Sequence, residues 1–431
     1  MKLNYKRTIL VGFAFFLISA FWQAYDAIVP KILTNLFDMD QASSGFIMSL
    51  DNILAVFLLP IFGAFSDKVK TPLGKRTPFI LIGTLCAAAA FVGLGFISSP
   101  NLLWLFILVL LLTLLSMAIF RSPAVALMPD VTIKPLRSKG NAVINLMGTA
   151  GGIIVLVLGK LFKTGEVGKT NYLSYIFAVC GLMLVGLIVF LLTVKEPLWV
   201  KEMEQESEKY GIDKIATAEA DNSPKRKLSR SELTSLFLIL ASVALWYIGY
   251  NAVTSKYSVY CQEVLKVDFN TTLIVAQAAA IVSYIPVGII SSKIGRKKSI
   301  LAGIVMLTAA FTAAIFITNV KSEMQMYPVF ILAGIGWATI NVNSFPMVVE
   351  LAKGGDVGKY TGYYYTASMS AQIVTPILSG LLIEKIGWNV FFPYAAIFTT
   401  LSFITMFFVK HGDSRPETRD ALEAFADSDA D

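Results

Sequence analysis

Long apolar segments alternate with short polar ones along almost the whole chain. Each apolar segment has about 20 residues or more, the length that a helix needs to cross a hydrocarbon core of roughly 30 Å. Glycine, proline and charged residues mark the breaks between them. The pattern predicts twelve membrane-spanning helices, near residues 8–30, 44–65, 77–98, 101–129, 140–162, 171–194, 233–255, 270–291, 299–319, 326–350, 360–383 and 390–409.

The spans form two groups of six, separated by a polar stretch. In that stretch, glutamates alternate with other residues over 202–208, a basic run follows at 225–227, and few aromatic residues are available to bury. We therefore expect a charged linker, helical in part at the membrane surface and without chemistry of its own. The predicted organisation is an N-terminal six-helix bundle over 1–194, a cytoplasmic linker over 195–232, a C-terminal six-helix bundle over 233–409 and a cytoplasmic tail over 410–431.

Composition agrees with this interpretation. Hydrophobic residues make up 56% of the chain and charged residues 15%, against about 25% charged in an ordinary soluble domain. The first apolar segment, Thr8 to Pro30, is too long for a signal-peptide core and has no small-residue cleavage site after it, so we interpret it as a membrane span.

The basic residues indicate an orientation. Of the 36 lysines and arginines, 27 fall in the termini, the linker and the connections on one side, 8 fall on the other side, and Arg121 lies within a span. The positive-inside rule therefore places both termini in the cytoplasm of a protein that crosses the cell membrane many times, with the lipid bilayer as its partner. The net charge of +7 follows this topology and does not predict nucleic-acid binding.

A basic loop recurs at the same place in each half. After the second span the chain carries Gly63, Asp67, Gly74, Lys75 and Arg76, and after the eighth span residues 288–298 repeat the device with Ser292 in place of the acid. Two similar six-helix halves are typical of major facilitator transporters, whose substrate site lies near the bilayer midplane between the halves. The first loop resembles that family's signature loop, and the resemblance implies a gating role that stabilises the outward-facing state. The alternative is a loop that only sets topology.

Three ionisable residues stand inside predicted spans. Because a charge in a span costs a few kcal/mol on insertion scales, Asp26, Asp51 and Arg121 are functional hypotheses. Trp22, Gln23 and Asp26 share one helical face, and an aromatic ring, an amide and a carboxylate together suit a sugar. Arg121 requires a carboxylate partner or a polar substrate, which makes Asp26 and Asp51 candidate cation-coupling acids. The alternatives are a water-contacting Asp26 and a purely structural ion pair. Asp130 and Glu350 lie at helix ends, where we expect helix-end roles rather than transport.

The second half has no charge inside its predicted spans. It offers aromatic and amide side chains instead, and these predict a neutral, hydrogen-bonding half-site, although each residue alone is as typical of helix packing. The candidates are Tyr250, Asn251, Gln277, Trp337, Asn341 and Tyr364.

Residues 63–80, ending in Gly-Lys-Arg-Thr-Pro-Phe-Ile, resemble the corresponding loop of sucrose transporters and their bacterial relatives in the glycoside, pentoside and hexuronide group. Further similarity lies at 50–52, which adds Asn52 as a candidate substrate contact, at 120–130 and at 250–253. The resemblance implies an all-α membrane protein with the major facilitator fold and proton-coupled symport of a disaccharide or glucoside, with Arg121 matching a sugar-contacting arginine. We expect it to act as a monomer without a cofactor.

The chain departs from its presumed relatives at two positions. Plant sucrose transporters have a proton-accepting aspartate where this chain has Leu110, and the melibiose-type branch has a second acid where it has Ala55. Coupling must then use Asp26 or Asp51, or be absent. Sodium-coupled sugar symport, proton-driven efflux of a drug or metabolite, and a transport-dead sensor remain alternatives.

Catalysis and metal binding are not indicated. The sequence has no metalloprotease motif and no second motif of an intramembrane aspartyl protease, and its one histidine, His411, falls in the tail. Cys86, Cys180 and Cys261 form neither a disulfide framework nor a metal-ligand pattern. The sequence therefore predicts that the protein is not an enzyme.

Overall fold

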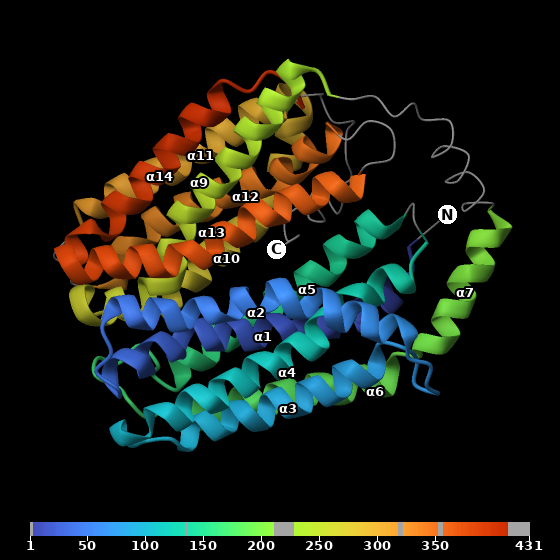
Figure 1. Ribbon diagram of the computed structural model, residues 1–431, viewed down its shortest axis with the longest axis horizontal. Coiled ribbons are helices and arrows are strands. Elements are labelled where there is room, and N and C mark those ends of the chain that lie inside the picture. The colour runs from blue at the N-terminus through green and yellow to red at the C-terminus, as the bar shows by residue number, and fades with distance from the viewer. Residues whose placement is uncertain (1–2, 134–135, 211–227, 318–321, 352–356, 413–431) are drawn as a thin grey trace. The chain divides into compact units, whose positions relative to one another are not determined.

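Nearly all of the computed structural model is helical (Figure 1). It describes residues 3–133, 136–210, 228–317, 322–351 and 357–412. The helices are α1 (Tyr5–Asn35), α2 (Gln41–Lys68), α3 (Thr77–Phe96), α4 (Leu103–Asp130), α5 (Arg137–Leu161), α6 (Leu173–Thr193), α7 (Glu196–Lys209), α9 (Arg230–Tyr260), α10 (Asn270–Ile294), α11 (Arg296–Ile315), α12 (Tyr327–Glu350), α13 (Val357–Ile386) and α14 (Phe391–Phe407), with a short π-helical turn, η3 (Cys261–Leu265), after α9.

The twelve predicted spans are confirmed. Among the described residues, twelve helices are long and apolar enough to cross a membrane. The largest differences are at the ends of α1, which continues five residues past Pro30 to Asn35, and of α9, which continues five residues past 255 to Tyr260. Pro30 did not end α1, although it has no N–H to donate to the Asp26 carbonyl. Proline is tolerated within membrane helices, and the Thr34 hydroxyl of the following turn donates to the Pro30 carbonyl at 3.1 Å.

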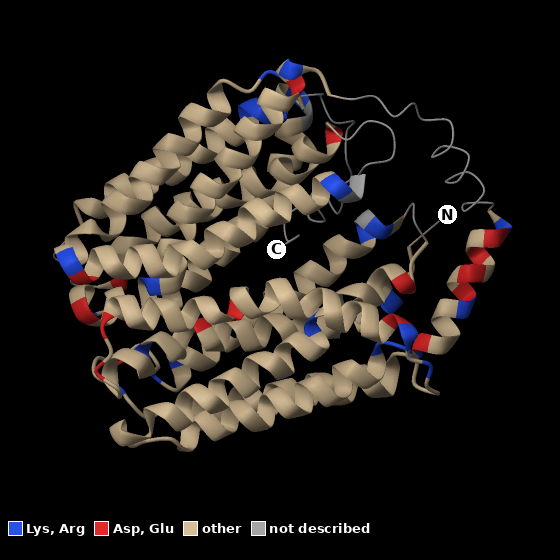
Figure 2. Ribbon diagram, viewed as in Figure 1, with Lys and Arg blue, Asp and Glu red and all other residues tan. Residues whose placement is uncertain are grey.

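The chain divides into two compact units. Unit 1 comprises residues 1–210 together with 258–271, and unit 2 comprises 211–257 and 272–431. In unit 1, α1 packs against α5 and α6, and α4 packs against α2 and α3. In unit 2, α11 packs against α12 and α14. Charged residues gather towards the helix ends, and few interrupt the middle of the spans (Figure 2).

The two halves repeat each other in their packing. A Cβ atom on Gly83 of α3 would come within 2.6 Å of Phe120 Cβ on α4, and a Cβ atom on Gly303 of α11 would come within 2.9 Å of Ile340 on α12. Both members of the second pair lie 220 residues after those of the first (303 − 83 and 340 − 120). In each half, a glycine therefore allows two corresponding helices to approach closely, α3 and α4 in the first half and α11 and α12 in the second.

The linker is helical over α7. Its glutamates Glu202, Glu204, Glu206 and Glu208 are exposed, as a solvated segment requires. Glu196, the first residue of α7, is instead only 1% exposed. The basic run at 225–227 lies outside the described residues.

Candidate functional site

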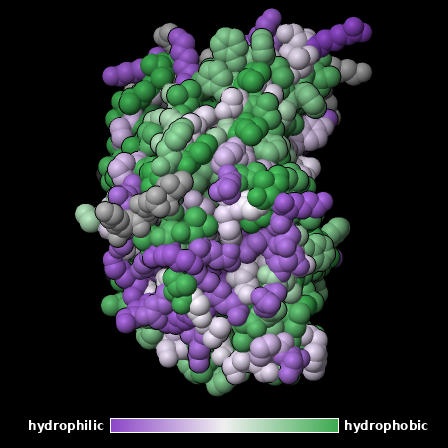
Figure 3. All heavy atoms as spheres, turned by 90° about the vertical axis from the view of Figure 1, so that its left-hand side faces the viewer, coloured by the Kyte–Doolittle hydropathy of each residue, from purple (hydrophilic) through white to green (hydrophobic). Residues whose placement is uncertain are grey.

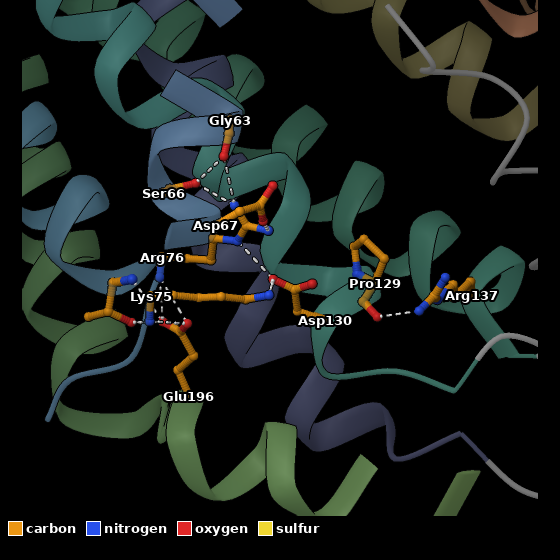
Figure 4. Close-up of polar contacts among 10 residues, drawn as sticks. Gly63, Ser66, Asp67, Lys75, Arg76, Pro129, Asp130, Arg137 and Glu196 are labelled. Carbon is orange, nitrogen blue, oxygen red and sulfur yellow. Dashed lines mark hydrogen bonds and ion pairs between the residues drawn. The ribbon is translucent and has the colours of Figure 1, made fainter. Parts of the chain in front are cut away.

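Arg76 stands at the centre of the network around the first basic loop (Figure 4). Arg76 is buried, with 4% of its surface exposed. Its Nε donates to Asp130 Oδ2 at 2.8 Å, and its other nitrogens donate to the Asp67 carboxylate, the Ser66 hydroxyl and, at 3.3 Å, the Gly63 carbonyl. The buried cation is thus surrounded by acceptors that replace water, which is the condition for burying a guanidinium.

Glu196 binds the start of α3 (Figure 4). Its carboxylate accepts the main-chain N–H groups of Lys75 at 2.7 Å, Arg76 at 2.9 Å and Thr77 at 2.8 Å, and the Thr77 hydroxyl at 2.7 Å. A carboxylate at a helix N-terminus satisfies N–H groups that have no partner within the helix and interacts favourably with the helix dipole. This contact was not predicted, because 120 residues separate the partners and Glu196 appeared to be an ordinary linker glutamate.

The two glycines of the loop have identifiable roles. Gly74 has a φ of +109°, a conformation that favours glycine, and a Cβ atom there would overlap the Glu196 carboxylate. A Cβ atom on Gly63 would come within 2.8 Å of the Ser122 hydroxyl on α4. The five residues predicted for gating, Gly63, Asp67, Gly74, Lys75 and Arg76, therefore converge on one network, and the Lys75 ammonium completes it at 3.1 Å from Asp130.

The second basic loop has an equivalent ion pair. Arg296 at the start of α11 contacts the Glu350 carboxylate at the end of α12. Arg296 and Glu350 are 54 residues apart, as are Arg76 and Asp130. Asp130 and Glu350 thus have the helix-end roles that their positions predicted. Glu350 corresponds to Asp130 and not to the loop acid Asp67, whose place Ser292 takes in the second loop; the side chain of Ser292 is outside the described residues.

In unit 1, polar side chains of α1, α2 and α4 lie close together. The Arg121 guanidinium is 5.6 Å from the centre of the Trp22 ring, and Trp22 meets Tyr25 edge-to-face at 5.4 Å. Asp51 interacts electrostatically with both Asp26 and Arg121. The structure therefore brings together the charged residues that the sequence singled out in the first six spans.

The surroundings of this cluster are partly polar. Asp51 Oδ1 accepts the main-chain N–H of Asn52 at 2.6 Å and its side-chain amide at 2.8 Å. Among the described residues, the Trp22 indole N–H and the Tyr25 hydroxyl are buried without a hydrogen-bond partner. Gln23 is partly exposed. Unsatisfied buried donors are costly unless something else binds them, so this cluster has hydrogen-bonding capacity for a ligand.

In unit 2, aromatic rings form a stacked group. The Tyr250 and Trp337 rings stack with centroids 3.7 Å apart and planes 5° from parallel. Tyr247 meets Trp337 edge-to-face at 5.2 Å. Tyr250 and Trp337 both keep part of their surface exposed, whereas Tyr247 is buried. The stacked Tyr250 and Trp337 rings thus form a flat aromatic platform, and Tyr247 packs edge-to-face against Trp337.

Amides of unit 2 retain unused hydrogen-bonding atoms. Within the described part of the chain, the Asn251 Nδ2 and Asn341 Oδ1 atoms are buried and have no hydrogen-bond partner. Gln277 is partly exposed. Tyr364 differs, because its hydroxyl is 2.9 Å from the Ser344 hydroxyl on α12 and its side chain is 2% exposed. Tyr364 therefore joins α12 to α13, and its predicted contact with substrate stays a prediction.

The sequence profile described as Major Facilitator Superfamily matches residues 11–372 and, in a second match, 277–427. The chain belongs to this superfamily. A relative from Methanocaldococcus jannaschii, described as an uncharacterized MFS-type transporter, is 26% identical over 413 residues, which cover 94% of this chain and 95% of the relative.

Solved structures of superfamily members share the fold. The inward-open xylose transporter XylE from E. coli matches with a TM-score of 0.70 at 14% identity, covering 98% of this chain and 99% of XylE. The nucleoside transporter NupG matches with a TM-score of 0.66 at 14% identity, covering 93% and 98%. A peptide transporter POT in complex with alafosfalin matches with a TM-score of 0.70 at 12% identity, covering 93% of each chain.

These findings confirm three predictions: that the chain crosses the membrane many times, that it has the major facilitator fold, and that it is a transporter rather than an enzyme. The chain is a multi-pass membrane transporter of the major facilitator fold, with twelve candidate spans among its described residues. Members of this superfamily move small molecules, and its matched relatives are transporters rather than enzymes. Identities of 12 to 14% support the fold alone.

Proposed function

We propose that this protein is a proton-coupled symporter that takes up a disaccharide or glucoside, resembling sucrose transporters. It acts as a monomer in the cell membrane with both termini in the cytoplasm. The observation that carries the proposal is the chemistry of its polar side chains. One set combines carboxylates, an arginine and an indole, and the other combines an aromatic platform with unsatisfied amides.

Each set suits a sugar. Flat aromatic faces bind the apolar faces of sugar rings, and carboxylate, guanidinium and amide groups bind neighbouring hydroxyls in pairs. In the proposed binding mode, Trp22, Gln23, Asp26, Asn52 and Arg121 contact one part of the substrate, and Tyr250, Asn251, Gln277, Trp337 and Asn341 contact another. Tyr364, whose hydroxyl lies 2.9 Å from the Ser344 hydroxyl, belongs to the same set of proposed contacts.

Proton coupling is assigned to Asp26 or Asp51. Leu110, at the position of the coupling aspartate in plant sucrose transporters, and Ala55, at the position of the second acid in the melibiose-type branch, have hydrocarbon side chains that cannot carry a proton. In the proposed cycle one carboxylate exchanges its contact with Arg121 for a proton when substrate binds. The basic-loop network around Arg76 gates the cytoplasmic side.

The test is substrate-dependent proton movement in proteoliposomes, with sucrose, maltose and monosaccharides supplied to wild type, Asp26→Asn, Asp51→Asn and Arg121→Ala. We expect sugar-dependent alkalinisation of the medium, abolished in one Asn variant that still exchanges sugar. Asp38→Asn is the matched control, because Asp38 is exposed and outside the spans and its positive φ of 49° is tolerated by asparagine.

Two other results would change the assignment. Sugar-dependent uptake that requires sodium and leaves the external pH unchanged would make the protein a sodium-coupled symporter. No response to any sugar in folded protein, at several pH values and with or without sodium, would contradict the sugar proposal and favour proton-driven efflux of a drug or metabolite.

A further inference from the structure

The connection between α9 and α10 packs with the first half of the chain. Residues 258–271, which include η3, belong to unit 1, although the helices on both sides of them belong mainly to unit 2. Within unit 1 they contact the end of α1 and the connection between α5 and α6. Figure 3 views the molecule from this end, where hydrophilic atoms gather in a broad band.

A reciprocal amide pair joins this connection to α1. Asn35 Nδ2 donates to Gln262 Oε1 at 2.9 Å, and Gln262 Nε2 donates back to Asn35 Oδ1. Asn35 Nδ2 also donates to the Lys169 carbonyl at 2.9 Å. Gln262 is 4% exposed. Losing either amide would leave buried groups of the other without their partner.

Lys31 organises the same region from one turn away on α1. Its side chain is fully buried, and its ammonium donates to the Thr164 carbonyl at 2.5 Å and the Glu166 carbonyl at 3.3 Å. The Phe269 ring lies 5.6 Å from the ammonium. The Thr164 hydroxyl in turn accepts from Asn270 Nδ2 at 2.9 Å. A buried ammonium needs such acceptors, so Lys31 fixes the α5–α6 connection in the conformation that binds Asn270.

Two glycines make room for the connection. A Cβ atom on Gly159 would overlap Asn270 Oδ1, and a Cβ atom on Gly165 would overlap Asp268 Oδ1. A second polar link, from Lys160 Nζ to the Thr271 hydroxyl at 2.7 Å, lies beside the first of these glycines. A segment that only connected α9 to α10 would need neither this close fit nor the paired amides.

We propose that Lys31, Asn35 and Gln262 form a clasp that closes the outer side of the transporter. The amide pair is the part that separates on opening, and Lys31 is a positioning residue that keeps the α5–α6 connection ready to receive Asn270. The proposal deepens the proposed function, since it names the residues that control access from outside, and it does not depend on which substrate is carried.

Cys261 is a native reporter of the clasp, because it adjoins Gln262 and is 1% exposed. In a Cys86→Ala, Cys180→Ala background, the labelling rate of Cys261 by a membrane-impermeant maleimide is measured in right-side-out vesicles. We expect Asn35→Ala, Gln262→Ala and Gly159→Ala each to raise the rate about tenfold, the factor for losing one to two hydrogen bonds. Lys31→Met should raise it as well.

Two controls match these variants. Gly181→Ala adds a methyl group where nothing lies within 4 Å, and Lys163→Met removes an ammonium whose side chain is 73% exposed; neither should change the rate. An unchanged rate in both Asn35→Ala and Gln262→Ala, with full labelling after denaturation, overturns the proposal.

A crosslink separates this proposal from the transport proposal. With the three native cysteines replaced by alanine, Asn35→Cys and Gln262→Cys are oxidised to a disulfide. If sugar transport is established, the crosslinked protein should lose it and regain it on reduction, and transport that continues in the crosslinked state contradicts the clasp. If no sugar is transported, the sugar proposal fails, while the Cys261 labelling rates still decide the clasp.

Discussion

Arg76 Nε lies 2.8 Å from Asp130 Oδ2, and Arg296 contacts Glu350. Each residue of the second pair stands 220 residues after its counterpart in the first pair (296 − 76 and 350 − 130). In each case the arginine lies at the start of one helix and the acid ends the following α-helix, α3 and α4 in the first half and α11 and α12 in the second. The two halves of the chain therefore close their basic loops with the same ion pair, even though the signature acid is present only in the first loop.

The Arg76–Asp130 pair should show strong energetic coupling. In a double-mutant cycle of Arg76→Gln and Asp130→Asn, we expect a coupling free energy of about 1–3 kcal/mol, because both residues belong to one hydrogen-bonded network and Arg76 is buried. Reversible unfolding in mixed micelles measures it. The Lys163–Glu166 pair, with side chains 73% and 55% exposed, is the control and should give about 0.5 kcal/mol or less. Equal coupling free energies in the two cycles would show that burial of the network does not strengthen the Arg76–Asp130 ion pair.

Glu196 should stabilise the start of α3. Glu196→Ala removes the acceptor of three main-chain N–H groups and one hydroxyl, so we expect a loss of about 2–4 kcal/mol in the free energy of unfolding. Glu204→Ala, an exposed position on the same helix, should change stability by less than about 0.5 kcal/mol. Thermal unfolding of both variants in one detergent makes the comparison. Equal melting temperatures would contradict the assigned role.

Asp40 should make the stability of α2 depend on pH. It is the N-cap of α2, and the main-chain N–H and hydroxyl of Ser43, both at 2.7 Å, lower the pKa of this carboxyl below its ordinary value of 3.8. A lowered pKa in the folded state means that the stabilisation is complete above pH 3.8 and is lost as the pH falls through the folded-state pKa.

The matched variants are Asp40→Asn and Asp40→Ala. Asparagine is an equally good N-cap that does not titrate, so Asp40→Asn should lose stability less steeply than wild type as the pH falls below 3.8. Asp40→Ala should lose about 1 kcal/mol near neutral pH. Melting temperatures measured across this range test both statements. Parallel curves for wild type and Asp40→Asn would rule out the titrating cap.

Much of the fold could be predicted because membrane spans have a strong local signal. Every span was recognised from about 20 consecutive apolar residues. The misjudged end of α1 has a physical cause: Pro30 removes only the one hydrogen bond that its missing N–H would make, and membrane helices tolerate that loss, so the helix continues past it. The structure also brings the five signature-loop residues together, since their contacts depend on local turns and close approaches; their gating role stays a prediction.

Contacts between distant segments were beyond sequence reasoning. Neither the 120 residues between Arg76 and Glu196 nor the 227 between Asn35 and Gln262 leave a pattern in a single sequence. Lys31 was counted simply as a basic residue of the outer side, although it is fully buried. Buried polar side chains with distant partners require the fold to be known before their partners can be named.

Trp337 should determine sugar affinity through the shape of its ring. It stacks on Tyr250 at 3.7 Å, so Trp337→Ala removes half of the platform, and we expect sugar affinity to fall about tenfold to a hundredfold, given the usual size of aromatic contributions. Trp337→Phe keeps a flat face and should lose less. The measurement is sugar binding to purified protein, with Trp104→Phe as control because Trp104 is 66% exposed on α4. If Trp337→Ala bound sugar as wild type does, the stack would have a packing role only, and the second set of proposed contacts would have to be sought among Asn251, Gln277 and Asn341.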